Sequence, residues 1–332
     1  MQYIEILNFL YSQILHMGNH HRYKNFPFPR NRISLENAFN RLKNYIEPKE
    51  NFNFVGHRLG DFLHYPKNVN EVEYIKTYKG TTELMQKGFN DSGLNGLELD
   101  LRKSSDGEVY VTHDEIKNEL HPDSLNYLSN NTFYKFINNY IDNQYYKYNK
   151  LFIELKVSPK ILDIETFSLF PDTLNLTEKQ LIENIFTILD KALIPYPELK
   201  GEIKKSISFV SFSKRSLEYA FEYSKDIYEY FLIVSTNQFI KKELSPLLYY
   251  TPFDENQILA IKKADWLTGI WFDPFHVDNL FEIFLDINSN REKKLKYYVS
   301  TYGMDFNELL NKFKSSFRNS KLPVSGMIFD II

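Results

Sequence analysis

The chain has 332 residues, of which 43% are hydrophobic and 25% charged, an ordinary globular composition with enough residues to bury a full core. Its formal net charge of −3 argues against binding nucleic acid through bulk positive charge. The absence of cysteine excludes disulfide bonds, thiolate metal sites and a cysteine nucleophile.

The amino-terminal segment differs from the rest of the chain. Met1–Met17 is partly apolar and predicts a short helix, but Glu5 stands where a signal peptide carries basic residues, and no small-residue cleavage site follows. A basic connector leads to a second predicted helix, which Ser34 caps and Pro48 ends. We therefore expect residues 1–50 to form a helical extension with a basic connector. No apolar run is long enough to cross a bilayer, so a cytoplasmic protein without a transmembrane segment is expected.

From residue 51 onward, short apolar runs recur at intervals that mostly leave room for a helix. The eight runs are Phe52–Gly56, Gly96–Leu101, Leu151–Val157, Ile207–Phe212, Tyr230–Ser235, Thr268–Phe272, Tyr297–Thr301 and Ser325–Asp330. Thr177 with Gln180 forms a capping-box pair before one helical pattern, and Ser213 precedes another. Eight strands that alternate with helices predict a parallel α/β fold.

Eight such units either close into a barrel or lie open as a doubly wound sheet. No glycine-rich phosphate loop follows the first strand, which favours the barrel. Asp106-Gly107 predicts a tight turn, so Glu108–Thr112 is expected to form an additional strand, a small insertion after strand 2. The predicted fold is a (β/α)8 TIM barrel over residues 51–332, with the helical extension at its amino terminus.

Polar residues gather where the predicted strands end, which in a barrel is the active face. They are His57, Arg58, Glu98, Asp100, His113, Glu154 and Lys156. Glu98 and Asp100 are two residues apart on one strand, so their side chains are expected to point the same way, into the barrel. The leucines beside them are expected to face the covering helices.

Three carboxylates that converge inside a barrel cannot all stay ionised without compensation. A divalent cation compensates them, and oxygen ligands suit Mg²⁺ or Ca²⁺ better than Zn²⁺. The two histidines have the chemistry to move protons, while Arg58 and Lys156 have the charge to neutralise a phosphate. A structural alternative gives Lys156 only the role of neutralising Glu154 or Glu98.

Taken in order, the motifs His-Arg, Glu-x-Asp, His-Asp and Glu-x-Lys are similar to the pattern of the glycerophosphodiester phosphodiesterase family. The matching segments are Phe54–Arg58, Leu97–Leu101, Asp106–Asp114, Ile153–Lys156 and Ser325–Asp330. Each motif is short, but the ordered set on consecutive strands is specific, and it spans about residues 52–330.

This resemblance implies a phosphoric diester hydrolase that cleaves a glycerophosphodiester to glycerol phosphate and an alcohol. The implied roles are binding of one divalent cation, Mg²⁺ or Ca²⁺, by Glu98, Asp100 and Glu154, acid–base catalysis by His57 and His113, and phosphate binding by Arg58 and Lys156. The implied partner is a small molecule, a glycerophosphodiester or a lysophospholipid. The pattern specifies no oligomeric state and does not say which histidine is the base.

Three departures from the family pattern fall in loops that shape the mouth of the site. Leu59 follows His-Arg where the family usually has glycine, and Gly60 comes one place later. Pro66–Val69 stands where a Pro-Glu-Asn-Thr segment is usual, and Ser300 precedes Thr301 where a tryptophan is usual. None of these removes a proposed catalytic side chain, so they bear on the identity of the substrate.

Two alternative functions remain open. A related two-histidine barrel that cleaves a phospholipid, such as a sphingomyelinase D or a phosphatidylinositol-cleaving enzyme, shares parts of the pattern. A non-catalytic barrel that binds a phosphorylated ligand belongs to a different class. The pairing of Glu-x-Asp with Glu-x-Lys fits the glycerophosphodiester phosphodiesterases better, and the complete polar set favours an enzyme.

Overall fold

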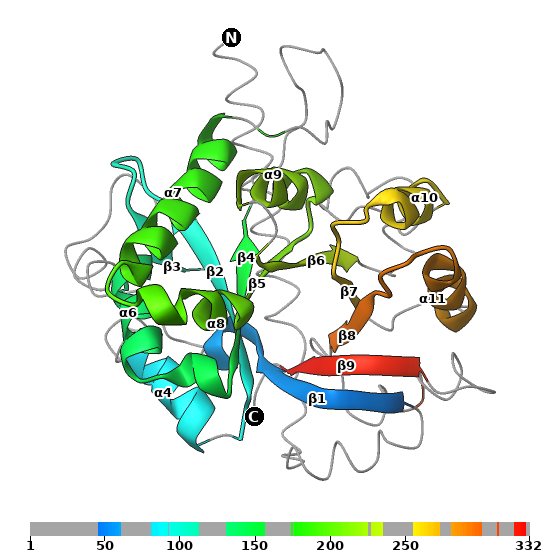
Figure 1. The fold of residues 1–332 in the computed structure, drawn as a ribbon, viewed down its shortest axis with the longest axis horizontal. Helices are drawn as coiled ribbons and strands as arrows, with labels where there is room; N and C mark the ends of the chain where they lie inside the picture. The colour runs from blue at the N-terminus through cyan, green and yellow to red at the C-terminus, as the bar shows by residue number, and fades with distance from the viewer. Residues whose placement is uncertain are drawn as a thin grey trace, which may run out of the picture.

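Eight parallel strands form a closed barrel in the computed structural model of the chain (Figure 1). The structure describes residues 46–60, 81–91, 93–112, 131–156, 174, 176–224, 227–234, 255–272, 280–300, 311 and 322–329. The barrel strands are β1 (Ile46–Gly56), β2 (Gly96–Lys103), β4 (Lys150–Leu155), β5 (Ile207–Ser211), β6 (Glu229–Val234), β7 (Gly269–Phe272), β8 (Lys296–Ser300) and β9 (Leu322–Phe329). Their order is β1-β9-β8-β7-β6-β5-β4-β2, and pairing of β1 with β2 closes the ring. The predicted TIM barrel is therefore confirmed.

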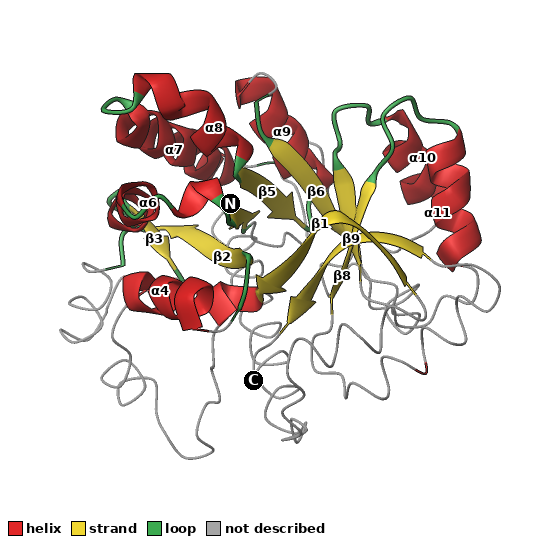
Figure 2. Cartoon of the chain, turned by 60° about the horizontal axis from the view of Figure 1, so that its bottom comes forward, coloured by secondary structure: helices red, strands yellow, loops and turns green. Residues whose placement is uncertain are grey.

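Helices pack around the outside of the barrel, as Figure 2 shows. They are α4 (Thr81–Asp91), α6 (Phe133–Asp142), α7 (Leu176–Leu193), α8 (Lys200–Lys205), α9 (Lys214–Ser224), α10 (Glu255–Lys263) and α11 (Leu280–Ser289), with 3-10 turns η1 (His57–Gly60), η2 (Tyr145–Lys147) and η3 (Pro197–Leu199). The predicted additional strand is confirmed as β3 (Val109–Val111), which pairs antiparallel with β2. None of the helices in the described ranges has the length and apolar character needed to span a membrane.

Two local predictions are wrong at helix ends. The helix expected between Ser34 and Pro48 does not reach Pro48, because β1 begins at Ile46 and pairs with β9 from there. Helix α7 begins at Leu176, so Thr177 lies inside its first turn instead of capping it. At Ile46, pairing with β9 overrides the local helical pattern. Ser213 precedes α9 as expected, and its side chain caps the helix by accepting a hydrogen bond from the Ser216 amide at 3.2 Å. Residues 1–45, most of the expected extension, lie outside the described residues, and the division at residue 50 stays a prediction.

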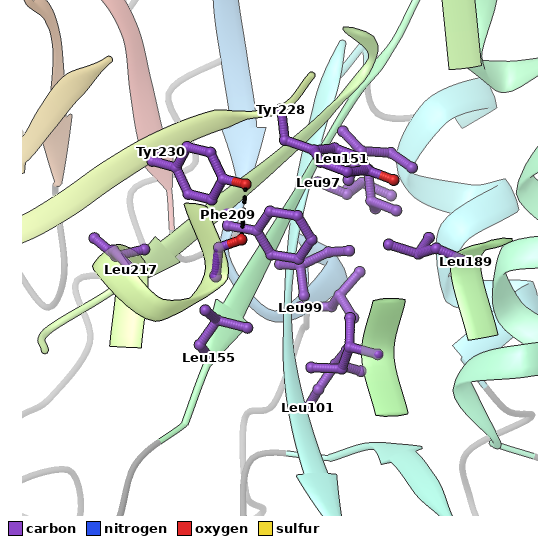
Figure 3. Packing of buried hydrophobic residues seen from close by; sticks show 14 of the residues in the cluster. Leu97, Leu99, Leu101, Leu151, Leu155, Leu189, Phe209, Leu217, Tyr228 and Tyr230 are labelled. Carbon is purple, nitrogen blue, oxygen red and sulfur yellow. Dashed lines mark hydrogen bonds between the residues drawn. The ribbon is translucent and has the colours of Figure 1, made fainter. Parts of the chain in front are cut away.

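The leucines that alternate with the acidic residues of β2 point outward and are buried against the layer of helices. Leu97, Leu99 and Leu101 are fully buried in a cluster that includes Leu189 of α7 and Phe209 of β5 (Figure 3). Each fully buried leucine contributes about 1.5–3 kcal/mol of transfer free energy, so this face anchors β2 firmly. The period of two then leaves Glu98 and Asp100 no direction except the barrel interior.

An aromatic layer fills the middle of the barrel. Phe152 of β4, Phe231 of β6 and Tyr298 of β8 meet with ring centroids 5.1–5.8 Å apart. These three strands alternate around the ring, as expected when the stagger of a closed barrel brings side chains from every second strand to one height. Trp271 of β7 packs edge-on against Phe152 at 5.8 Å. Residues two places further along these strands therefore lie in the next layer toward the carboxyl-terminal end.

An ion-pair network lies at the opposite, amino-terminal end. The Glu229 carboxylate pairs with both Lys150 and Lys296, and the Ser208 hydroxyl is 3.3 Å from its Oε2. Burial acts to raise the pKa of Glu229, but the charges of the two lysines outweigh it and hold the pKa below its ordinary value of 4.5. The network thus joins β4, β6 and β8 where the barrel interior meets solvent.

Glu229→Ala is expected to destabilise the fold by about 1–3 kcal/mol, since it leaves two half-buried ammonium groups without their shared counterion. The comparison is made by urea unfolding. Because the folded-state pKa of Glu229 is lowered, its stabilisation is complete above the ordinary carboxyl pKa of 4.5 and is lost as pH falls below that value. The stability difference between wild type and Glu229→Gln should therefore shrink in acid; a difference that grows below pH 4 would contradict this account.

Candidate active site

Three carboxylates converge inside the carboxyl-terminal end of the barrel. Glu98 and Asp100 come from β2 and Glu154 from β4, where Asp100 and Glu154 are paired in register. One oxygen of each lies within 4.8 Å of the others, and the three residues are only 1%, 3% and 5% exposed. The structure thus brings together the three residues predicted as metal ligands. An all-oxygen set of this charge and spacing fits one hard divalent cation.

Lys156 supplies a positive charge directly beside this cluster. Its Nζ is 2.9 Å from Asp100 Oδ1 and 2.7 Å from Glu154 Oε1. Burial raises the pKa of Glu154 to about 7, with a further rise from Asp100, although Lys156 acts in the opposite direction. Among the described residues, Lys156 is the ammonium group in contact with the cluster, and a divalent cation would supply further positive charge to the three carboxylates.

His57 stands at the edge of the carboxylate cluster. It is the first residue of η1, directly after β1, and its Nε2 lies 3.9 Å from Glu98 Oε2. Its side chain is 11% exposed, so it combines contact with the cluster and access to solvent. Arg58 follows in η1, where only its backbone is described, and His113 lies outside the described residues.

The turn that carries His57 has an unusual backbone. Leu59 adopts φ +64°, the left-handed conformation that favours glycine, at the position where the resembled family usually has glycine. A side chain there costs about 1–2 kcal/mol. Leu59 is only 3% exposed and packs in the outer core, and burial of a leucine contributes a comparable amount of free energy in return. Leucine in place of glycine is therefore compatible with the left-handed turn that follows His57.

Ser300 was not predicted as a site residue from the sequence motifs. It ends β8 and is 2% exposed, as buried as the three carboxylates. As a departure from the family pattern it was expected in a loop at the mouth of the site, and that expectation is wrong, because Ser300 is the last residue of a barrel strand. The signal that was available is the alternation along Lys296–Ser300, which turns Lys296, Tyr298 and Ser300 to the same side of the strand. Since Tyr298 packs in the aromatic layer, Ser300 faces the interior as well.

Solved structures with a similar fold are known, although the sequence itself has no close match. No family model matches the chain, and no curated protein matches it. Similar solved structures include glycerophosphodiester phosphodiesterases from Parabacteroides distasonis (12% identity, 84% of this chain and 94% of that chain, TM-score 0.44) and Agrobacterium tumefaciens (13%, 84% and 95%, TM-score 0.47). A protein from Silicibacter pomeroyi assigned as a glycerophosphoryl diester phosphodiesterase is 10% identical and covers 88% of this chain and 94% of its own, with a TM-score of 0.53. The chain therefore shares the barrel fold of the Silicibacter protein.

Proposed function

We propose that this protein is a phosphoric diester hydrolase that cleaves a glycerophosphodiester to glycerol phosphate and an alcohol. The observation that carries the proposal is the buried cluster of Glu98, Asp100 and Glu154 with Lys156 at its side. The cluster lies at the end of the barrel where enzymes of this fold keep their active sites. The ordered sequence motifs and the shared fold agree with this assignment.

The three carboxylates would hold one Mg²⁺ or Ca²⁺ ion, which neutralises phosphate charge and polarises a phosphoryl oxygen when bound. Lys156 and Arg58 both hold further phosphoryl oxygens through charge-assisted hydrogen bonds. Lys156 already lies within contact of two of the carboxylates, so it is positioned to bridge the cluster and an anionic substrate. This differs from the purely structural role, in which the lysine only neutralises Glu154 or Glu98.

His57 and His113 carry the proton transfers. One imidazole removes a proton from the attacking oxygen as the new P–O bond forms. The other donates a proton to the alkoxide oxygen as the P–O bond to the alcohol breaks. The attacking oxygen belongs either to water or to the neighbouring glycerol hydroxyl, and the second route passes through a cyclic phosphate that water then opens.

A substrate screen tests the proposal. The chain is supplied with Mg²⁺ or Ca²⁺ and offered glycerophosphocholine, glycerophosphoethanolamine, glycerophosphoinositol and lysophospholipids, with release of glycerol phosphate or of a free headgroup as the readout. We expect turnover of at least one glycerophosphodiester that excess chelator abolishes. Turnover of lysophospholipids alone would support the phospholipid-cleaving alternative. Tight binding of these compounds without turnover would support the non-catalytic barrel.

A further inference from the structure

Ser300 faces the carboxylate cluster from the other side of the barrel. In the closed ring, β8 lies four strands from β4 in either direction, so the two strands are opposite each other. Phe152 and Tyr298, on these two strands, meet in the aromatic layer with ring centroids 5.2 Å apart. Glu154 and Ser300 are each two residues further along and therefore share the next layer. A ligand held by the carboxylate side would extend across that layer toward Ser300.

The Ser300 hydroxyl is a buried polar group that lacks a hydrogen-bond partner among the described residues. A hydroxyl in that condition costs about 1–3 kcal/mol relative to one that is satisfied. The buried serines of β5, by contrast, have partners on the barrel strands: Ser208 donates to the Glu229 carboxylate at 3.3 Å, and Ser211 donates to the Leu155 carbonyl at 3.0 Å. The exception at Ser300 is therefore a hydrogen-bonding group available to a ligand at the end of the barrel where the carboxylates lie.

The wall around Ser300 selects a neutral group over a charged one. Two described interior residues of this region are apolar: Ile328 of β9 is paired in register with Ser300, and Ile233 of β6 belongs to the same interior cluster as Ile328. Trp271 contributes a second buried donor, Nε1–H, that has no partner within the described part of the chain. Lys156, a positively charged residue in the described part of the site, lies on the opposite wall beside Asp100 and Glu154. An anionic phosphoryl group is stabilised beside the cationic side chains, whereas the apolar surroundings of Ser300 favour a neutral hydroxyl group.

We propose that Ser300 is a specificity-determining residue that hydrogen-bonds a hydroxyl group of the glycerol part of the substrate. A serine hydroxyl both donates and accepts, which matches an alcohol hydroxyl better than a group that only accepts. This inference rests on the proposed function, because it names the part of a glycerophosphodiester that crosses the barrel. A site that hydrogen-bonds a substrate hydroxyl discriminates against analogues that lack it.

The test compares two product-like ligands that differ only in their hydroxyl groups. Glycerol 3-phosphate and propyl phosphate are titrated into the Mg²⁺-loaded protein by calorimetry, for wild type, Ser300→Ala and Ser300→Thr. Wild type should prefer glycerol 3-phosphate. Ser300→Ala should weaken glycerol 3-phosphate binding about tenfold and leave propyl phosphate binding unchanged, whereas Ser300→Thr, which keeps the hydroxyl, should retain the preference.

Thermal unfolding separates this role from a structural one. Because Ser300 has no described partner to lose, Ser300→Ala should keep the melting temperature of wild type. Ser211→Ala is the matched control: it removes a buried serine that has partners, so it should lower the melting temperature and leave the ligand preference intact. Equal weakening of both phosphates, or no change in either, in a folded Ser300→Ala protein would overturn the proposal.

Failure of the proposed function would look different. Wild type would then turn over no glycerophosphodiester in the substrate screen, whatever its preference between the two phosphates. A preference for glycerol 3-phosphate that disappears in Ser300→Ala would still support the serine contact in that case. Loss of discrimination only at Ser300, with normal turnover, identifies the contact as one of specificity.

Discussion

His57→Ala and His113→Ala are each expected to lower kcat by about a hundredfold or more with the fold unchanged, since general acid–base catalysis contributes roughly 10²–10⁴-fold. Breaking a phosphodiester requires one proton to leave the nucleophile and another to reach the departing alkoxide. Histidine is suited to these steps because its imidazole ring can both accept and donate a proton. His57 already lies 3.9 Å from the carboxylate cluster. The measurement is steady-state kinetics on the substrate identified by the screen.

The control for the histidine variants is His16→Ala, which changes a histidine of the expected amino-terminal extension and should keep wild-type turnover. The kcat/KM of wild type should follow a bell-shaped pH curve, and each active-site variant should lose one limb of it. Near-normal turnover in both His57→Ala and His113→Ala would show that the acid–base pair is misassigned. Circular dichroism of each variant excludes loss of the fold as the cause of lost activity.

Chelation is expected to abolish turnover, and Glu98→Gln to weaken metal binding by about a hundredfold, since affinity at oxygen-ligand sites follows the number of charged ligands. Removing one carboxylate from a cluster whose members lie within 4.8 Å also relieves repulsion in the metal-free protein. The metal-free melting temperature should therefore stay equal or rise. Calorimetric titration with Mg²⁺ and Ca²⁺ measures the affinity, and thermal unfolding measures the stability.

Glu218→Gln provides the matched control for the metal site. Glu218 pairs with Arg215 on the surface of α9, away from the cluster, so its loss should leave metal affinity and turnover unchanged. Asp100→Asn and Glu154→Gln should weaken metal binding to a similar extent, but each also removes a counterion of Lys156, so the equal or higher melting temperature is expected for Glu98→Gln and not for these two variants. Full activity of wild type in excess chelator would exclude the proposed role of the cation, even if the three carboxylates bind metal in the calorimeter.

Much of the fold was predictable because it depends on patterns that are local in the sequence. The eight apolar runs correspond to the eight barrel strands, and the turn at Asp106-Gly107 precedes β3 as expected. Helix ends were less predictable. Ile46 falls on the helical pattern that starts at Ser34, yet it lies in β1 because residues of β9, almost three hundred positions away, supply its backbone pairing.

The candidate site divides in the same way. The spacing of Glu98 and Asp100 between buried leucines was sufficient to turn both carboxylates into the interior, because a strand alternates its side chains with a period of two. That Glu154 would join them followed from its place on the next barrel strand. The sequence allowed Lys156 to contact Glu154 or Glu98, and its contact with Asp100 did not follow, because a flexible lysine side chain reaches whichever neighbours the packed barrel brings near it.

By itself, the sequence determined which residues face the interior and which chemical groups gather at the carboxyl-terminal end, since strand periodicity and motif order depend only on neighbouring residues. Only the tertiary structure decided what lies opposite those groups. The role proposed for Ser300 depends on barrel closure, which sets β8 across from β4, and on the stagger of the strands, which brings Ser300 to the height of Glu154. The physical reason is that closure and stagger arise from hydrogen bonds between strands far apart in the chain, and no local pattern encodes that distance.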